Sequence, residues 1–226
     1  MNLIKDYRIL LGQGVVARFD TETYSDAVAF ARIGEGSLGG KARGLAFMNS
    51  MLLKHRQYDK HDNLRIMIPR SVVIATDYFD EFIRNNGLKY IISQEFSDEE
   101  ILSEFVSSTI PVKLQRELKA YIKTVSTPLA VRSSSKLEDS HYQPFAGIYS
   151  TYMIPYTEGN EDRQLRLLQK AIKSVYASTY FAASKAYVQS SQNLIAEEKM
   201  AVVIQEVCGT EQDGLCLLYT SDAADD

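Results

Sequence analysis

Apolar runs rich in β-branched residues recur along the chain and predict the strands of a sheet. The clearest runs lie at residues 66–76, 128–135, 147–155 and 199–207. The second run, "PLAVRSSS", begins apolar and then gives way to Arg132 and three serines. We therefore expect a short buried strand that ends at Arg132, with a polar segment after it.

Segments between these strands carry the start and stop residues of helices. Residues 77–87 begin with Asp77 and end in Asn-Gly, which is typical of a helix. Ser97 and Glu100 have the spacing of a capping box, so a helix is expected to start there. Pro111 suits the first turn of the next helix.

Further helices are expected on either side of these segments. Residues 161–190 are predicted to form one long helical stretch, and Ser25 to cap a short helix through residues 26–33. Residues 41–56 have helical periodicity with one apolar side, made by Leu45, Met48, Met51 and Leu52. We expect Met48, Met51 and Met67 to fill the core. The irregular order of strands and helices favours an α+β fold over a doubly wound sheet.

The composition is that of an ordinary globular protein and excludes some functions. The chain has 226 residues, is 45% hydrophobic and carries a net charge of −4, so no basic field exists to hold nucleic acid. Cys208 and Cys216 lack the spacing of a zinc site or a disulfide framework, which fits a reducing cytosol. No apolar run approaches the ~20 residues that span a bilayer, and no secretory signal is recognisable. A cytoplasmic protein without membrane or nucleic-acid partners is expected.

The stretch "RIGEGSLGGKARG", residues 32–44, combines five glycines with Lys41 and predicts an anion site. Its glycine spacing matches a dinucleotide fingerprint, with Asp59 at a suitable distance, but the residues before Gly34 do not form a clear strand. A Walker A loop would need glycine where Glu35 stands and a hydroxyl residue where Ala42 stands. A simpler interpretation is a glycine turn that opens a helix, whose free amides and Lys41 face one anion. An ordinary tight turn with a solvated lysine is the alternative.

A second polar cluster follows the predicted strand at 128–135. The guanidinium of Arg132 could grip phosphate oxygens with two parallel hydrogen bonds, and the serines offer hydroxyl groups. The alternative is a polar loop in which Arg132 pairs with Glu138 or Asp139.

Four segments in order resemble the N-terminal nucleotide-binding region of the phosphoenolpyruvate synthase and pyruvate phosphate dikinase family. They are "SLGGKARGLAFM" (37–48), "IPRSVVIATDYFDEFIRNNGL" (68–88), "LAVRSSSKLEDSHYQPFAGIYSTY" (129–152) and "MAVVIQEV" (200–207). The resemblance implies an ATP-grasp-like fold with two lobes that hold ATP. In that family, phosphate passes from ATP to a histidine on a separate domain and then to pyruvate.

The resemblance also assigns residues to the phosphates. It places the family's glycine-glycine-lysine on Gly39, Gly40 and Lys41, with Lys41 on the ATP phosphates. It makes Arg132 the arginine that stabilises charge as the phosphoryl group moves. Lys41 and Arg132 are thus the expected catalytic residues. The other expected phosphate-side contacts are Ser133, Ser134, Asp139 (beside Glu138) and Gly147, the end of a Phe-Ala-Gly turn.

At the other end of the nucleotide, the family pattern falls on the end of the last predicted strand. Gln205 and Glu206 match its glutamine-glutamate pair, and the backbone of Glu206 and Val207 would meet the adenine edge. The family's magnesium carboxylates follow this strand in segments with no match here, so Mg²⁺ is an expected cofactor without assigned ligands. No phosphohistidine motif surrounds His55, His61 or His141. The phosphohistidine and pyruvate-binding domains are therefore expected partners, and the chain alone is not expected to complete turnover.

The chain departs from the family at several places. Ser135, Lys136 and Leu137 replace an alanine-threonine-like pair, and Pro144 replaces a common serine. We expect residues 1–24 to be a lead-in segment, 25–209 to be the ATP-binding domain, and 210–226 to be a tail, either non-native or flexible. The expected function is ATP-dependent phosphotransfer to pyruvate. An enzyme with a glucan or antibiotic acceptor, or a non-catalytic nucleotide-sensing module, is the alternative.

Overall fold

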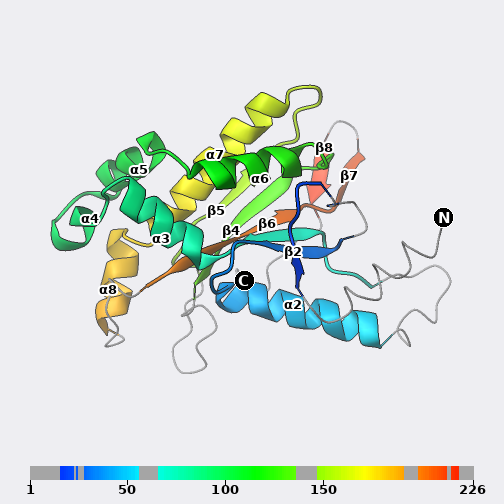
Figure 1. Ribbon diagram of the computed structural model, residues 1–226, viewed down its shortest axis with the longest axis horizontal. Helices are drawn as coiled ribbons and strands as arrows, with labels where there is room; N and C mark the ends of the chain where they lie inside the picture. The colour runs from blue at the N-terminus through cyan, green and yellow to red at the C-terminus, as the bar shows by residue number, and fades with distance from the viewer. Residues whose placement is uncertain are drawn as a thin grey trace.

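A computed structural model of the chain describes residues 16–22, 24, 28–55, 66–135, 147–190, 198–212 and 215–218. Within these ranges, strands of one mixed sheet lie between helices on both faces (Figure 1). The helices are α2 (Gly39–Lys54), α3 (Thr76–Asn85), α4 (Tyr90–Ser93), α5 (Asp98–Ser107), α6 (Val112–Ile122), α7 (Glu161–Ser178) and α8 (Ala182–Ser190). The strands are β1 (Ala17–Arg18), β2 (Phe30–Ile33), β3 (Ser71–Ile74), β4 (Leu129–Ser135), β5 (Thr151–Ile154), β6 (Met200–Glu206), β7 (Gly209–Gln212) and β8 (Leu215–Leu218). The mixture fits the expected α+β class.

The sheet has a parallel half and an antiparallel half. Its described strands follow the order β1-β2-β3-β6-β4-β5. Strands β1, β2 and β3 pair in parallel, and α2 connects β2 to its neighbour β3. Strand β6 pairs antiparallel with both β3 and β4, and β5 pairs antiparallel with β4. Strands β7 and β8 form a separate antiparallel hairpin.

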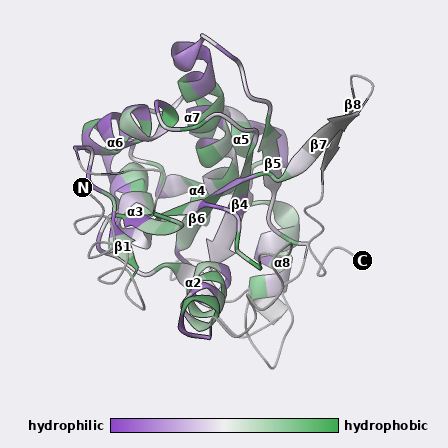
Figure 2. Cartoon of the chain, turned by 90° about the vertical axis from the view of Figure 1, so that its right-hand side faces the viewer, coloured by the Kyte–Doolittle hydropathy of each residue, from purple (hydrophilic) through white to green (hydrophobic). Residues whose placement is uncertain are grey.

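The two faces of the sheet carry unequal layers. The main core joins one face, with residues such as Val72, Val131 and Ile204, to α3, α5, α6 and α7. On the other face a smaller cluster joins Phe30, Val73, Ala201 and Val203 to Ala42 of α2. Figure 2 shows α2 apart from the other helices, across the sheet from α6 and α7. Successive residues of a strand point to opposite faces, so Arg132 and Ser134 lie on the α2 side.

Three predicted strands and the capping box are confirmed, and one predicted helix start is shifted by one residue. The long apolar runs gave β3, β4 and β6, although β3 is shorter than its run. Ser97 and Glu100 form both hydrogen bonds of the capping box at the start of α5. Pro111 lies at the N-cap of α6, one residue before its first turn.

Other element predictions are wrong. Residues 30–33 form β2 rather than a helix, because Phe30 packs toward α2 while Ala31 and Ile33 pack into the main core. Ser25 lies outside the described residues. The stretch 161–190 breaks at residues 179–181 into α7 and α8. Strand β4 does not end at Arg132, because the serines after it continue the pairing with β6.

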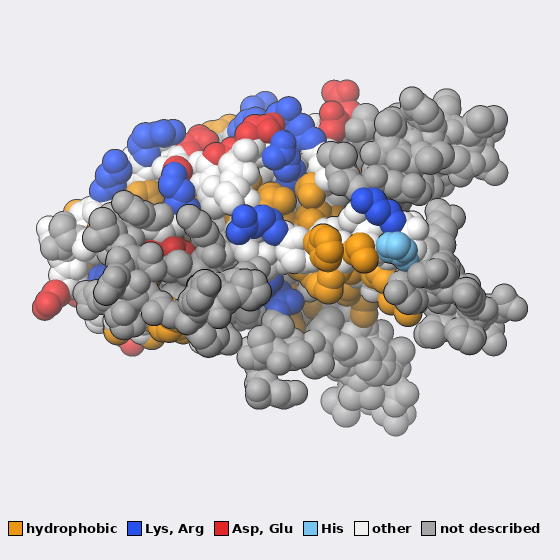
Figure 3. Space-filling model, turned by 90° about the horizontal axis from the view of Figure 1, so that it is seen from below, with side chains coloured by type: hydrophobic (Ala, Val, Ile, Leu, Met, Phe, Trp, Pro, Cys, Tyr) orange, Lys and Arg blue, Asp and Glu red, His pale blue; other side chains and the backbone are white. Residues whose placement is uncertain are grey.

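The methionines expected in the core lie at the surface. Met48, Met51 and Met67 are 50%, 42% and 59% exposed, and Phe47 is also exposed. Helix α2 is fully buried only near its start, at Gly39, Gly40 and Ala42, and Leu45 is partly buried against the sheet. Seen from the α2 side, the molecule shows a hydrophobic area (Figure 3). The apolar positions of α2 therefore divide between the sheet, which takes Leu45, and the surface.

Candidate nucleotide site

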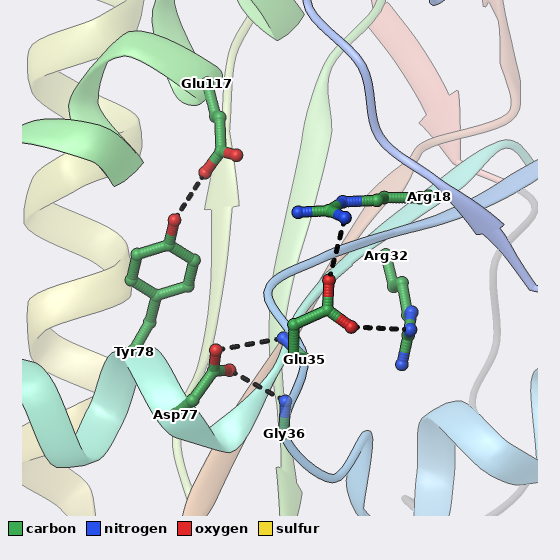
Figure 4. A network of polar contacts seen from close by, with 7 residues as sticks. All are labelled: Arg18, Arg32, Glu35, Gly36, Asp77, Tyr78 and Glu117. Carbon is green, nitrogen blue, oxygen red and sulfur yellow. Dashed lines mark hydrogen bonds and ion pairs between the residues drawn. The ribbon is translucent and has the colours of Figure 1, made fainter.

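The first part of the glycine stretch already holds a carboxylate of the protein itself. Asp77, in the first turn of α3, accepts hydrogen bonds from the backbone amides of Glu35 (2.9 Å) and Gly36 (3.0 Å) (Figure 4). Gly34 has a φ of 94°, and a Cβ there would lie 2.5 Å from an Asp77 carboxylate oxygen. These glycines are needed because the loop closes around Asp77.

The contact with Asp77 argues against a dinucleotide site. The sequence had argued against it for another reason, the lack of a clear strand before Gly34. A strand, β2, does precede Gly34, so the predicted lack of a strand is wrong. The amides of Glu35 and Gly36 bind Asp77, however, and are not available to a pyrophosphate in this structure. Asp59 lies outside the described residues.

A second set of bonds fixes the chain just before α2. The amide of Ser37 donates to the hydroxyl of Thr76 (3.0 Å), and the amide of Thr76 donates back to the carbonyl of Ser37 (3.0 Å). The carboxylate of Glu35 lies outside this loop, where it pairs with Arg18 (3.2 Å) and Arg32 (2.9 Å). The start of α3 therefore sets the position at which α2 begins.

Helix α3 is itself tied to α6. The hydroxyl of Tyr78 donates to the carboxylate of Glu117 at 2.7 Å (Figure 4). Burial, together with this bond, raises the pKa of Tyr78 well above its ordinary value. The hydroxyl thus keeps its proton at physiological pH, and the neighbouring Asp77 stands on an anchored helix.

The N-terminus of α2 is held against β4 by Ser134. The Ser134 hydroxyl donates to the carbonyl of Leu38 (2.8 Å) and accepts from the amide of Ala42 (3.0 Å). Gly39, with a φ of 72°, lies so close to β4 that a Cβ would be 1.8 Å from the Ser134 carbonyl oxygen. The hydroxyl uses its donor and one acceptor position on α2, so it joins α2 to β4.

The two expected catalytic residues lie on one side of the sheet. Lys41 is in the first turn of α2, as predicted, next to the Ala42 that bonds Ser134. Arg132 lies in the middle of β4, two residues before Ser134 and on the same face. Both side chains are partly buried and both have polar partners within the protein. The chain segments that carry them therefore meet at Ser134.

The other phosphate-side candidates lie in different surroundings. Ser133 and Ser135 are buried within β4. Gly40 is buried in the first turn of α2. Gly147 is exposed, with a φ of 72° and open space around the position of a Cβ. Asp139 and Glu138, and the rest of the Phe-Ala-Gly turn, lie outside the described residues.

Gln205 lies one residue before the end of β6, as predicted, and its side chain is beside Arg132. Its side-chain carbonyl accepts a hydrogen bond from Nη1 of Arg132 at 3.2 Å. Its amide nitrogen donates to the hydroxyl of Ser71 at 3.3 Å. Sequence reasoning did not include Ser71, because nothing local in "IPRSVVI" indicates a partner that is 134 residues away.

Glu206 and Val207, which were predicted to contact the adenine, form hydrogen bonds and an ion pair within the protein. The amide of Glu206 donates to the carbonyl of Arg70 (2.8 Å), and that of Val207 donates to Pro128 (2.9 Å). The Glu206 carboxylate forms an ion pair with Arg70, and both side chains are mostly buried. A nucleotide base at this segment would thus contact groups other than these two amides.

The described residues offer no metal site of their own. No group of three or more His, Cys, Asp or Glu side chains among them could hold a metal ion. His55 is exposed at the end of α2, while His61 and His141 lie outside the described ranges. The described residues therefore assign no ligands to magnesium, and no step here depends on one.

Among the described residues, no helix has the length and apolar composition needed to cross a membrane.

Comparison with known proteins places these features in a family. The profile described as "Pyruvate phosphate dikinase, AMP/ATP-binding domain" matches residues 35–226. An uncharacterized phosphotransferase of Bacillus subtilis, YvkC, is 29% identical over 197 residues, which are 84% of this chain and 20% of that protein. The phosphoenolpyruvate synthase of Aeropyrum pernix is 28% identical over 200 residues, which are 79% of this chain and 22% of that enzyme.

The match covers most of the glycine stretch, from residue 35, and the last strand of the sheet. The chain spans about a fifth of the length of these two relatives, so it corresponds to one part of them. Its expected resemblance is confirmed: the chain belongs to the family of pyruvate phosphate dikinase AMP/ATP-binding domains.

Proposed function

We propose that this chain is the nucleotide-binding part of a phosphoenolpyruvate synthase-like phosphotransferase. Lys41 and Arg132 hold the phosphates of ATP, and the segment of Glu206 and Val207 lies toward the adenine. The phosphoryl group passes to a histidine on a separate domain of the full-length protein and from there to pyruvate. The family membership and the phosphoenolpyruvate synthase relative support this proposal.

The observation that carries the proposal is the meeting of two cationic segments at Ser134. The Ser134 hydroxyl bonds the first turn of α2, which carries Lys41, and Arg132 lies two residues before Ser134 on the same face of β4. A helix N-terminus carries a partial positive charge, and the first turn of α2 has no acidic residue to offset it. Helix α6 has the same pattern, with Lys113 in its first turn, so the feature that distinguishes α2 is the nearby strand that carries Arg132. A bound anion would face the helix N-terminus and both cations.

Phosphoryl transfer asks the protein mainly to position the phosphates and to neutralise developing charge. The glycine loop and Ser134 give the first turn of α2 a fixed position for this task. Pairing of β4 with β5 and β6 fixes the backbone position of Arg132. A different acceptor, such as a glucan or an antibiotic, would use the same nucleotide site.

A non-catalytic nucleotide-sensing module is the second candidate. It would use the same nucleotide site, so the internal bonds of the Glu206 and Val207 amides apply equally to both candidates. The ATP-binding experiment described next distinguishes both candidates from a chain that binds no nucleotide.

The test is thermal unfolding with ATP and magnesium, on the native chain and on Lys41→Ala and Arg132→Ala. Saturating ATP, at about 100 times its Kd, should stabilise the native chain by about 2.7 kcal/mol. Each variant should weaken ATP binding by roughly 10- to 100-fold, since a hydrogen bond to a charged group contributes about 1.5–3 kcal/mol. Lys54→Ala, at the other end of α2, is the matched control and should bind ATP as the native chain does.

Equal binding by the native chain and by both variants would show that the site is elsewhere. Normal ATP binding without phosphotransfer, in a full-length protein that contains the acceptor domain, would favour the sensing module.

A further inference from the structure

Three polar side chains on neighbouring strands form a hydrogen-bonded series on the α2 face of the sheet. Ser71 of β3 is paired in register with Gln205 of β6, and Gln205 is paired with Ala130 of β4. Arg132 is two residues beyond Ala130 and on the same face. Gln205 therefore lies between Ser71 and Arg132, within bonding distance of both.

The direction of each bond in this series is determined. The hydroxyl of Ser71 donates its proton to the carbonyl of Pro69 at 2.8 Å, so it can only accept from Gln205. The amide nitrogen of Gln205 provides that bond at 3.3 Å. The carbonyl oxygen of Gln205 must then face Arg132, whose guanidinium has only donors. Ser71 thus orients the side-chain amide of Gln205 so that its oxygen faces Arg132.

Burial makes this orientation costly to lose. Gln205 is 5% exposed and Ser71 is fully buried. If a buried amide loses a partner, no water replaces it. The side chains of Ser71, Gln205 and Arg132 are therefore held in one set of hydrogen bonds.

We propose that Gln205, held by Ser71, is a positioning residue that fixes the guanidinium of Arg132 toward the phosphates. This inference rests on the proposed function and replaces the expected role of Gln205 at the adenine. A glutamine suits the task because it is neutral: it uses one of the five N–H donors of Arg132 and leaves the positive charge undiminished. A carboxylate at this position would hold the arginine equally well but would offset the charge that the phosphates need.

The first test is a double-mutant cycle on ATP affinity, measured by calorimetry. Gln205→Met removes both hydrogen bonds and keeps the side-chain length. It should weaken ATP binding by about tenfold in the native background, the effect of losing about one hydrogen bond. In the Arg132→Ala background it should change ATP affinity less than twofold, because its effect acts through Arg132. Ser71→Ala should shift affinity in the same direction by a smaller factor.

Gln115→Met is the matched control, since Gln115 is in α6, away from this face, and donates to the carbonyl of Ile110 just before that helix. It should leave ATP affinity unchanged. An equal loss of affinity from Gln205→Met in both backgrounds would overturn the proposal and restore a direct contact of Gln205 with the nucleotide.

The second test needs no nucleotide and separates this inference from the proposed function. Rotation of the Arg132 guanidinium about its Cζ–Nε bond is measured by ¹⁵N exchange NMR on the ligand-free chain. Gln205→Met should speed this rotation about tenfold, and Gln205→Glu, which keeps an acceptor, should not. If the native chain fails to bind ATP, the proposed function fails. If rotation is unchanged in Gln205→Met, the positioning role fails whatever the chain binds.

Discussion

Gly39 and Ser134 meet backbone to backbone, and this contact joins the helix that carries Lys41 to the strand that carries Arg132. The position of a Cβ on Gly39 would lie 1.8 Å from the carbonyl oxygen of Ser134. The Ser134 hydroxyl then bonds the first turn of α2 on both sides of Gly39, at Leu38 and Ala42. One glycine and one serine therefore set the distance between the two cationic segments.

Replacing Gly39 should damage both stability and the site. Gly39→Ala places a methyl group against backbone and requires a left-handed φ of 72°, which alone costs about 1–2 kcal/mol. We expect a loss of more than about 2 kcal/mol in the free energy of unfolding, measured in urea.

Gly44→Ala, in the same helix, is the control. A Cβ at Gly44 would meet nothing within 4 Å, so this variant should be neutral or more stable by up to about 1 kcal/mol. Similar unfolding curves for the two variants would show that the contact with Ser134 does not constrain α2.

Removing the carboxylate of Asp77 should loosen the loop before α2. Asp77→Ala leaves the amides of Glu35 and Gly36 without their acceptor, and we expect a loss of about 1–3 kcal/mol in unfolding free energy. Hydrogen exchange should become faster at these two amides. Asp80→Ala, on the same helix, removes only an exposed pair with Lys199 and should cost about 1 kcal/mol or less. Unchanged exchange at Glu35 and Gly36 would contradict the role of Asp77.

The ion pair between Arg70 and Glu206 should show strong coupling. Their side chains are only 14% and 15% exposed, and Arg70 also donates to the carbonyl of Thr124. Glu206→Met should destabilise by about 3 kcal/mol, because it removes a carboxylate partner from a mostly buried charge. The double variant Arg70→Met/Glu206→Met should be more stable than the sum of the two single losses predicts. Additive losses in urea unfolding would show that the pair is not coupled.

The capping box of α5 should give stability that depends on acid. Hydrogen bonds from the backbone and side chain of Ser97 lower the pKa of Glu100 below its ordinary value of 4.5. Its contribution is therefore present above pH 4.5 and is lost as the pH falls through the lower, folded-state pKa. The difference in unfolding free energy between the native chain and Glu100→Ala should shrink over that range. Glu99→Ala, in the same turn but outside the box, should give a smaller difference at neutral pH.

Local patterns predicted the parts of the fold that depend on local physics. The Ser97–Glu100 box and the strands β4 and β6 follow from spacing and from β-branched composition, and the structure contains them. Lys41 at the start of a helix could also be predicted, since the glycines before it mark the turn.

Relationships between distant residues could not be predicted in this way. Asp77 carries the pattern of a helix start, and nothing near it indicates that its carboxylate closes a loop 41 residues earlier. Arg132 was expected at a strand end because serines follow it, but pairing with β6 outweighs the low strand preference of serine. The methionines of α2 have core composition, yet their exposure depends on which layers lie beneath the helix.

The order of strands has a consequence for how the chain folds. Strand β6 lies between β3 and β4, although it follows both in the sequence. During synthesis the parallel half and the antiparallel half of the sheet thus emerge from the ribosome with no central strand to join them. Pairings between residues so far apart in sequence form slowly. Shortened forms that end before Met200 should therefore expose two unpaired strand edges and aggregate.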